Sequence, residues 1–122
     1  MGTSEAHTLT KRERLSGKRN ISRLMSEGRW GSCQGFKFCC LRETGEDVNR
    51  LMVSVPKRLF KRAVKRNLLK RRIREAWRTQ KDLLTPDAGT DILILYNSPE
   101  IMTTARISES VAAIMHQVSG WE

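Results

Sequence analysis

The feature that most constrains the fold is a helical repeat of apolar residues between Asn67 and Leu84. At 100° per residue, one arc of that helix gathers Leu69, Ile73, Ala76, Trp77, Leu83 and Leu84. A neighbouring arc carries Lys70, Arg71, Arg74 and Arg78, with Asn67 beside them. The pattern predicts a helix that packs on another element through its apolar arc and exposes its basic arc.

Three further segments are typical of β-strands. Residues 35–42 alternate, with Phe36, Phe38 and Cys40 predicted to face the core, and residues 50–55 form a second strand. We interpret these two as a hairpin closed by a turn at residues 43–47. Residues 91–97 are apolar on both faces and predict a buried strand. A short strand at residues 61–64 is a weaker prediction.

Two more helices are expected at the ends of the domain. The first spans about Gly17 to Glu27, with Ser16 as its N-cap and Gly28 as its stop. Thr104 is the predicted N-cap of the second, which ends near Gly120. Its apolar face repeats with helical spacing at Ile107, Val111, Ile114, Met115 and Val118. The order of elements predicts an α+β fold in which helices pack on a four-stranded sheet.

The length of 122 residues fits one domain. We expect residues 1–14 to be a flexible tail with a basic end, residues 15–119 to form the domain, and residues 120–122 to be the C-terminal end. We expect neither a membrane span nor a signal peptide, because the chain has no apolar run long enough for either. Three cysteines without a CxxC pair argue against a disulfide framework or a zinc site, so a cytoplasmic location is expected.

Charge supplies the main functional signal. The chain carries 23 Lys and Arg against 13 acidic residues, a net charge of +10. Residues 57–81 contain twelve of the cations and one acid, Glu75, so this segment alone carries +11. A solvated basic face that only aids solubility is one interpretation, but concentration of the charge favours a phosphate-binding surface.

The same residues resemble the RNR motif of the bacterial ribonuclease P protein family. The family pattern R-N-x-x-K-R-x-x-R-E-x-x-R is matched at Arg66, Asn67, Lys70, Arg71, Arg74, Glu75 and Arg78. The resemblance covers roughly residues 15–118 and implies an αβββαβα two-layer sandwich with a left-handed βαβ crossover, also seen in a ribosomal protein domain. It implies a subunit that binds the catalytic RNA and the 5′ leader of precursor tRNA, while the RNA subunit hydrolyses the phosphodiester with Mg²⁺.

The resemblance also implies site residues. The expected contacts with the catalytic RNA are Lys57, Arg58, Arg62, Arg66, Asn67, Lys70, Arg71, Arg74 and Arg78. The expected leader cleft comprises Ile21, Met25, Lys37, Cys39 and Val53. No catalytic side chain, metal ligand, membrane or DNA partner is expected. Glu75 is expected to orient a neighbouring Arg.

This chain departs from the family pattern where the leader is expected. Ile21 and Met25 occupy positions that are often Phe, and Cys39 occupies one that is often Tyr. Trp30 and Phe60 lie near basic residues and are alternative base-stacking candidates, whereas Trp77 is expected in the core. Lys37 and Cys39 are also compatible with an ordinary exposed strand face.

Three other functions are rivals to this interpretation. A general structured-RNA-binding protein of ribosomal type would use the same basic helix. A DNA-binding regulator would need a second helix just before Asn67, and the sequence predicts none there. A nuclease made of protein alone would need a carboxylate cluster for metal ions, which the sequence does not suggest.

Overall fold

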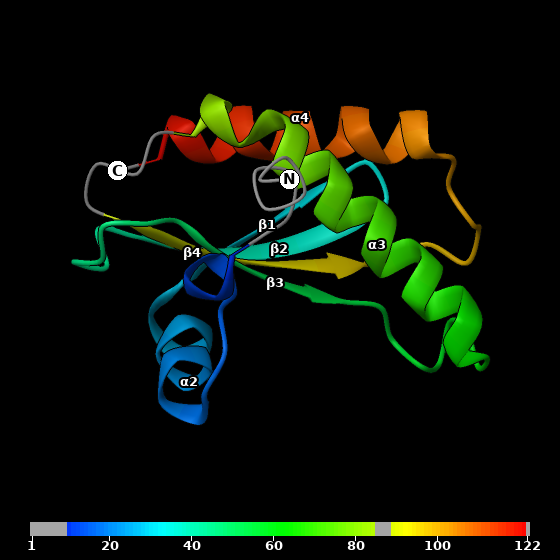
Figure 1. The fold of residues 1–122 in the computed structure, drawn as a ribbon, viewed down its shortest axis with the longest axis horizontal. Helices are drawn as coiled ribbons and strands as arrows, with labels where there is room; N and C mark the ends of the chain where they lie inside the picture. Colours follow the sequence, from blue (N-terminus) through cyan, green and yellow to red (C-terminus); the bar gives the residue numbers. More distant parts are fainter. Residues whose placement is uncertain (1–9, 85–88, 122) are drawn as a thin grey trace, which may run out of the picture.

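The computed structural model describes residues 10–84 and 89–121, which form an α+β sandwich around a four-stranded sheet (Figure 1). Helices α3 and α4 cover one face of the sheet, and α2 lies against the other (Figure 1). The elements in chain order are η1 (Lys11–Glu13), α2 (Lys18–Glu27), β1 (Arg29–Cys33), β2 (Phe36–Arg42), β3 (Arg50–Ser54), α3 (Ala63–Gln80), η2 (Lys81–Leu83), β4 (Thr90–Tyr96) and α4 (Thr104–Ser119).

The strand order β1-β2-β4-β3 corrects the predicted pairing. β4 lies between β2 and β3, antiparallel to β2 and parallel to β3, so the hairpin predicted from residues 35–42 and 50–55 is wrong. The hairpin joins β1 to β2 instead, through Gln34 and Gly35, which both have positive φ. β3, α3 and β4 form the βαβ unit, and its crossover is left-handed (Figure 1).

Two predictions about strands fail for local reasons. β1 was not predicted, because Arg-Trp-Gly-Ser-Cys shows no apolar alternation; as an edge strand it pairs only with β2. The short strand predicted at residues 61–64 is wrong: these residues lead into α3, which starts at Ala63. The predicted helix at Asn67–Leu84 is present, and it begins four residues earlier and ends in the 3₁₀ turn η2.

The main core fills the space between the sheet and α3/α4. Phe36, Phe38 and Cys40 of β2 are buried there, as the alternation predicted. The predicted apolar residues of α4 are all at 0% exposure, and Trp77 of α3 is at 1%. Thr103 rather than Thr104 caps α4, by accepting a hydrogen bond from the Arg106 amide at 3.2 Å. The low exposure of Trp77 makes it a core residue, as expected.

A second, smaller core lies beneath α2 and comprises Leu15, Leu24, Cys39 and Leu93. The predicted N-cap is wrong, since Gly17, at φ 90°, occupies this position without a side-chain cap. Gly28 ends the helix as predicted. A Cβ there would lie 2.5 Å from the Leu24 carbonyl oxygen and 2.6 Å from the Cys39 sulfur, so glycine allows α2 to approach β2 closely.

The predicted tail is partly structured. Residues 1–9 lie outside the described residues, but Thr10 and Glu13 form a capping box around η1, and the Leu15 amide donates to the Leu51 carbonyl at 2.9 Å. The ordered domain thus includes Thr10 to Arg14. At the other end, Trp121 stacks on Phe38 with ring centroids 5.5 Å apart. Within the described residues, no helix is long and apolar enough to span a membrane.

Candidate RNA interface

Helix α3 buries Leu69, Ile73, Ala76 and Trp77 against the core, so the helix geometry turns its cations outward. Six of the predicted RNA-contact residues are exposed, and they are Lys57, Arg58, Arg62, Asn67, Arg71 and Arg74. The other three, Arg66, Lys70 and Arg78, are partly buried. All nine belong to α3 or to the loop before it, and we call these nine residues the basic face.

Arg66 is part of the basic face and also makes hydrogen bonds within the protein. One of its terminal nitrogens donates to the carbonyl oxygens of Phe60 and Lys61, both at 2.7 Å. These bonds fix the loop that carries Lys57, Arg58 and Arg62 onto the start of α3. Phe60 is only 7% exposed and packs edge-on against Tyr96, so it is a core residue rather than a base-stacking candidate.

Two other charged residues of α3 have protein partners. Glu75 accepts a hydrogen bond from Arg78, with Nε 3.3 Å from Oε1, which confirms the expectation that it orients a neighbouring arginine. Arg72 donates to the Met102 carbonyl at 2.7 Å and so links α3 to the segment before α4. In contrast, the side chains of Lys70, Arg71 and Arg74 make no hydrogen bond or ion pair with any part of the chain that the structure describes.

The electrostatics of the basic face are visible at Arg74. Desolvation lowers the pKa of Arg74, and the positive charge of Arg14 lowers it further. Arg14 was assigned to the tail and was missed as a site residue. The available signal was its position directly before the apolar Leu15, which is typical of a chain segment with one face buried and one exposed.

The predicted leader-cleft residues do not share one surface. Val53 lies in the core beneath α3 and α4, on the sheet face opposite α2, and its place in the predicted cleft is wrong. Cys39 is fully buried beneath α2, where its thiol donates to the Leu24 carbonyl at 3.4 Å. The prediction failed at Val53 because its strand alone does not show which sheet face α3 and α4 cover, and at Cys39 because α2 packs closely enough to bury the thiol.

A surface beside α2 does expose several candidates. Lys37 is exposed on the α2 face of β2, and Trp30 lies on the same face because it is paired with Cys39 across the strands. Trp30 is 46% exposed, as is Met25 on α2, while Ile21 is half-buried. We call Trp30, Lys37, Ile21 and Met25 the sheet surface. It has one aromatic ring, but on β1 rather than on α2.

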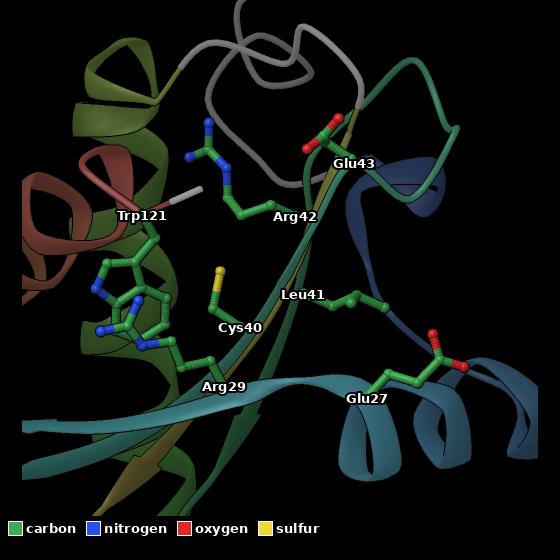
Figure 2. A pocket seen from close by; sticks show the side chains of 7 residues that line it. All are labelled: Glu27, Arg29, Cys40, Leu41, Arg42, Glu43 and Trp121. Atoms are coloured by element: carbon green, nitrogen blue, oxygen red, sulfur yellow. The ribbon is translucent and has the colours of Figure 1, made fainter.

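Two hollows lie on the surface of the described structure. One, of about 360 Å³, is lined by Leu68, Arg71, Arg72, Glu75 and Thr104, between α3 and the start of α4. The other, of about 160 Å³, lies where the end of β2 meets the C-terminal end (Figure 2) and is lined by Glu27, Arg29, Cys40, Leu41, Arg42, Glu43 and Trp121.

The second hollow is a structural junction. Arg29 lies over the Trp121 ring, 4.3 Å from its centroid (Figure 2), and Arg42 donates to the Val118 carbonyl at 3.3 Å. Burial raises the pKa of Cys40 to about 12, so this thiol stays protonated at neutral pH. Two arginines and two glutamates line this hollow, and the balance of charge gives it no preference for an anion.

Within residues 10–84 and 89–121, no group of three or more His, Cys, Asp or Glu side chains is placed to hold a metal ion. The basic face instead presents exposed cations, and side chains of this kind are suited to binding anions such as phosphate.

Comparison with known proteins gives a consistent result. A family profile described as Ribonuclease P matches residues 9–119. The ribonuclease P protein component of Thermotoga maritima is 38% identical over 89 residues, covering 72% of each chain. That of Chlorobaculum tepidum is 33% identical over 92 residues, covering 70% of this chain and 58% of the relative.

Solved structures agree with these matches. The RNase P protein of Staphylococcus aureus superposes with a TM-score of 0.76 at 26% identity, covering 90% of this chain and 98% of that one. The RNase P protein of Thermotoga maritima gives a TM-score of 0.75 at 25% identity, with 88% and 99% covered.

Proposed function

The chain belongs to the ribonuclease P protein family, and from this premise we propose how its surfaces divide the binding of RNA. It is the protein component of ribonuclease P, the ribonucleoprotein endoribonuclease that matures the 5′ end of tRNA, and it associates with the ribonuclease P RNA. The observation that carries the proposal is the row of exposed cations on α3 and its entry loop.

The basic face is proposed to anchor the catalytic RNA. Arginine contacts phosphate with two parallel hydrogen bonds, and lysine acts as a point charge. Lys70, Arg71 and Arg74 are held on a rigid helix without acidic partners among the described residues, so binding RNA breaks no ion pair at these positions. Release of counterions from RNA then supplies much of the binding free energy.

Catalysis is proposed to reside in the RNA partner. The Mg²⁺ that the holoenzyme requires would be held by RNA, and this chain would supply positioning and charge neutralisation. The exposed cations of the basic face support this division, because they can neutralise the charge of RNA phosphates. A cytoplasmic location is proposed with it and is supported by the free thiols of all three cysteines.

The sheet surface is proposed to contact the single-stranded 5′ leader of precursor tRNA. Lys37 provides a positive charge and Trp30 an exposed ring on the same face of the β1–β2 hairpin. Aromatic rings stack on unpaired bases irrespective of sequence, and a nearby cation attracts the phosphates. This surface is separate from the basic face, so one protein can hold two RNA segments.

Reconstitution with a bacterial ribonuclease P RNA at low Mg²⁺ tests the basic face. We expect the protein to stimulate 5′ cleavage of precursor tRNA, and Arg71→Ala or Arg74→Ala each to weaken RNA binding and lower the salt slope by about 1. Arg106→Ala is the matched control, since this α4 arginine makes an exposed ion pair with Glu100.

The comparison of variants decides the outcome. Equal effects of Arg71→Ala, Arg74→Ala and Arg106→Ala on affinity and salt slope would show that net charge, rather than the basic face, governs binding. Tight binding of any structured RNA without stimulation of cleavage would favour a general RNA-binding role instead.

A further inference from the structure

The N-terminal segment runs along the free edge of β3. Arg14 forms a parallel β-bridge with Leu51, and the Leu15 amide donates to the Leu51 carbonyl at 2.9 Å. Leu51 is buried on the α3 side of the sheet, whereas Leu15 is buried on the α2 side. Because consecutive residues of an extended segment point to opposite faces, the Arg14 side chain lies on the α3 side.

Arg14 thus reaches the basic face from outside the RNR motif. Arg74 is one residue after the buried Ile73, and Arg14 is the charged neighbour whose field acts on it. Both side chains belong to exposed residues. The acid next to Arg14 in sequence, Glu13, is engaged by the Lys81 ammonium at 2.9 Å.

Neither guanidinium has an ion pair or a hydrogen bond with any residue in 10–84 or 89–121. The anchoring of this segment rests on Leu15, the backbone bond to Leu51 and the capping box around η1, and none of these uses the Arg14 side chain. Two like charges near each other are unfavourable unless an anion binds between them. The pair therefore has a ligand-binding rather than a packing rationale.

We propose that Arg14 and Arg74 form a phosphate-binding pair that extends the RNA-binding surface from α3 onto the N-terminal segment. The inference rests on the proposed function, since the phosphate belongs to the ribonuclease P RNA. Each guanidinium presents a planar set of donors, so the two together engage one phosphate group or two adjacent ones along the RNA backbone.

The test measures the affinity of the protein for ribonuclease P RNA across a salt series, with Arg14→Ala, Arg74→Ala and the double variant. We expect each single variant to weaken binding roughly tenfold and to lower the salt slope by about 1, as for loss of a charge-assisted contact. The double variant should lose less than the product of the two single effects, because the two residues share a ligand.

Arg12→Ala is the matched control. It removes the same charge from the same segment, but Arg12 is paired with the exposed Asp47. Arg14→Lys retains the charge without the planar donor set and should fall between wild type and Arg14→Ala. Thermal melting of the free proteins establishes that each variant is folded at the assay temperature.

Three outcomes are distinguishable. Coupled losses at Arg14 and Arg74, with Arg12→Ala near wild type, support the pair. If wild type binds RNA and Arg14→Ala behaves like Arg12→Ala, the pair is refuted while the proposed function stands. If wild type itself does not bind ribonuclease P RNA, the proposed function fails and the inference fails with it.

Discussion

At the scale of single residues, one ion pair joins two strands that are far apart in sequence. Arg50 of β3 donates to both oxygens of Asp91 in β4, with Nε–Oδ1 at 2.7 Å and Nη2–Oδ2 at 2.8 Å. Asp91 is fully buried, and the Arg50 side chain is 12% exposed. The two residues are also directly paired in the parallel ladder, so the ion pair favours this register of β3 on β4.

Asp91→Ala is expected to lower the free energy of unfolding by about 3–5 kcal/mol, because it leaves the Arg50 charge partly buried and unpaired. Urea unfolding followed by circular dichroism measures the change. Asp47→Ala is the control: Asp47 pairs with Arg12 at the surface, where ion pairs contribute about 0–1 kcal/mol. Similar losses for the two variants would show that burial of the Arg50–Asp91 pair is unimportant.

This pair also marks the limit of sequence reasoning at the residue scale. The buried apolar residues of α4 and Trp77 of α3 were predicted, because helical periodicity is a local property of the chain. Partnership between Arg50 and Asp91 depends on which strands are neighbours. That arrangement is set by packing of the whole sheet and leaves no local signal.

At the scale of elements, helices were easier to predict than strand pairing. The apolar faces of α3 and α4 repeat over many residues, so the sequence pattern is long enough to recognise. β1 has only five residues and one hydrogen-bonded neighbour. The wrong hairpin followed from pairing two strands that are consecutive among those predicted, although β4 enters between them. Missing β1 also hid the face on which Trp30 lies, so the sheet surface was only partly predicted.

The β1–β2 hairpin carries the next prediction. Trp30→Ala should weaken binding of precursor tRNA by the assembled holoenzyme by about 1–3 kcal/mol for each base that stacks on the ring, without affecting mature tRNA. Affinities of leader-containing and leader-free tRNA, measured side by side, report the difference. Trp30→Phe retains an aromatic ring and should keep most of the discrimination.

The tRNA comparison separates leader contact from damage to the fold. An equal loss of affinity for both tRNAs would argue against a leader contact at Trp30. Intrinsic fluorescence of the free protein provides a check, since Trp77 is buried and Trp121 is stacked on Phe38, leaving Trp30 as the exposed indole within the described residues.

At the scale of the whole molecule, the fold gathers the excess positive charge on one side of the domain. The net charge is +10, yet the segment 57–81 carries +11, so the rest of the chain is close to neutral. The sandwich confines this charge to the loop before α3 and the outer side of α3, with Arg14 added from the sheet edge. Self-repulsion on one side of a small domain lowers its stability, and an anion bound there relieves it.

Sulfate or phosphate should therefore stabilise the free protein more than chloride at matched ionic strength. An anion that binds only the folded form at ten times its Kd adds about 1.4 kcal/mol, a rise in Tm of roughly 4–6 °C for a domain of this size. Thermal melting followed by circular dichroism measures the shift.

Three variants separate anion binding from a general salt effect. Arg71→Ala and Arg74→Ala should reduce the shift in Tm, because they remove binding groups, while Arg106→Ala should leave the shift unchanged. Sulfate is also excluded from protein surfaces in general, and that effect would raise the Tm of every variant equally. A shift that is the same in all variants would thus assign the stabilisation to solvent exclusion, and a shift that depends on Arg71 and Arg74 would assign it to anions bound where the RNA phosphates are proposed to lie.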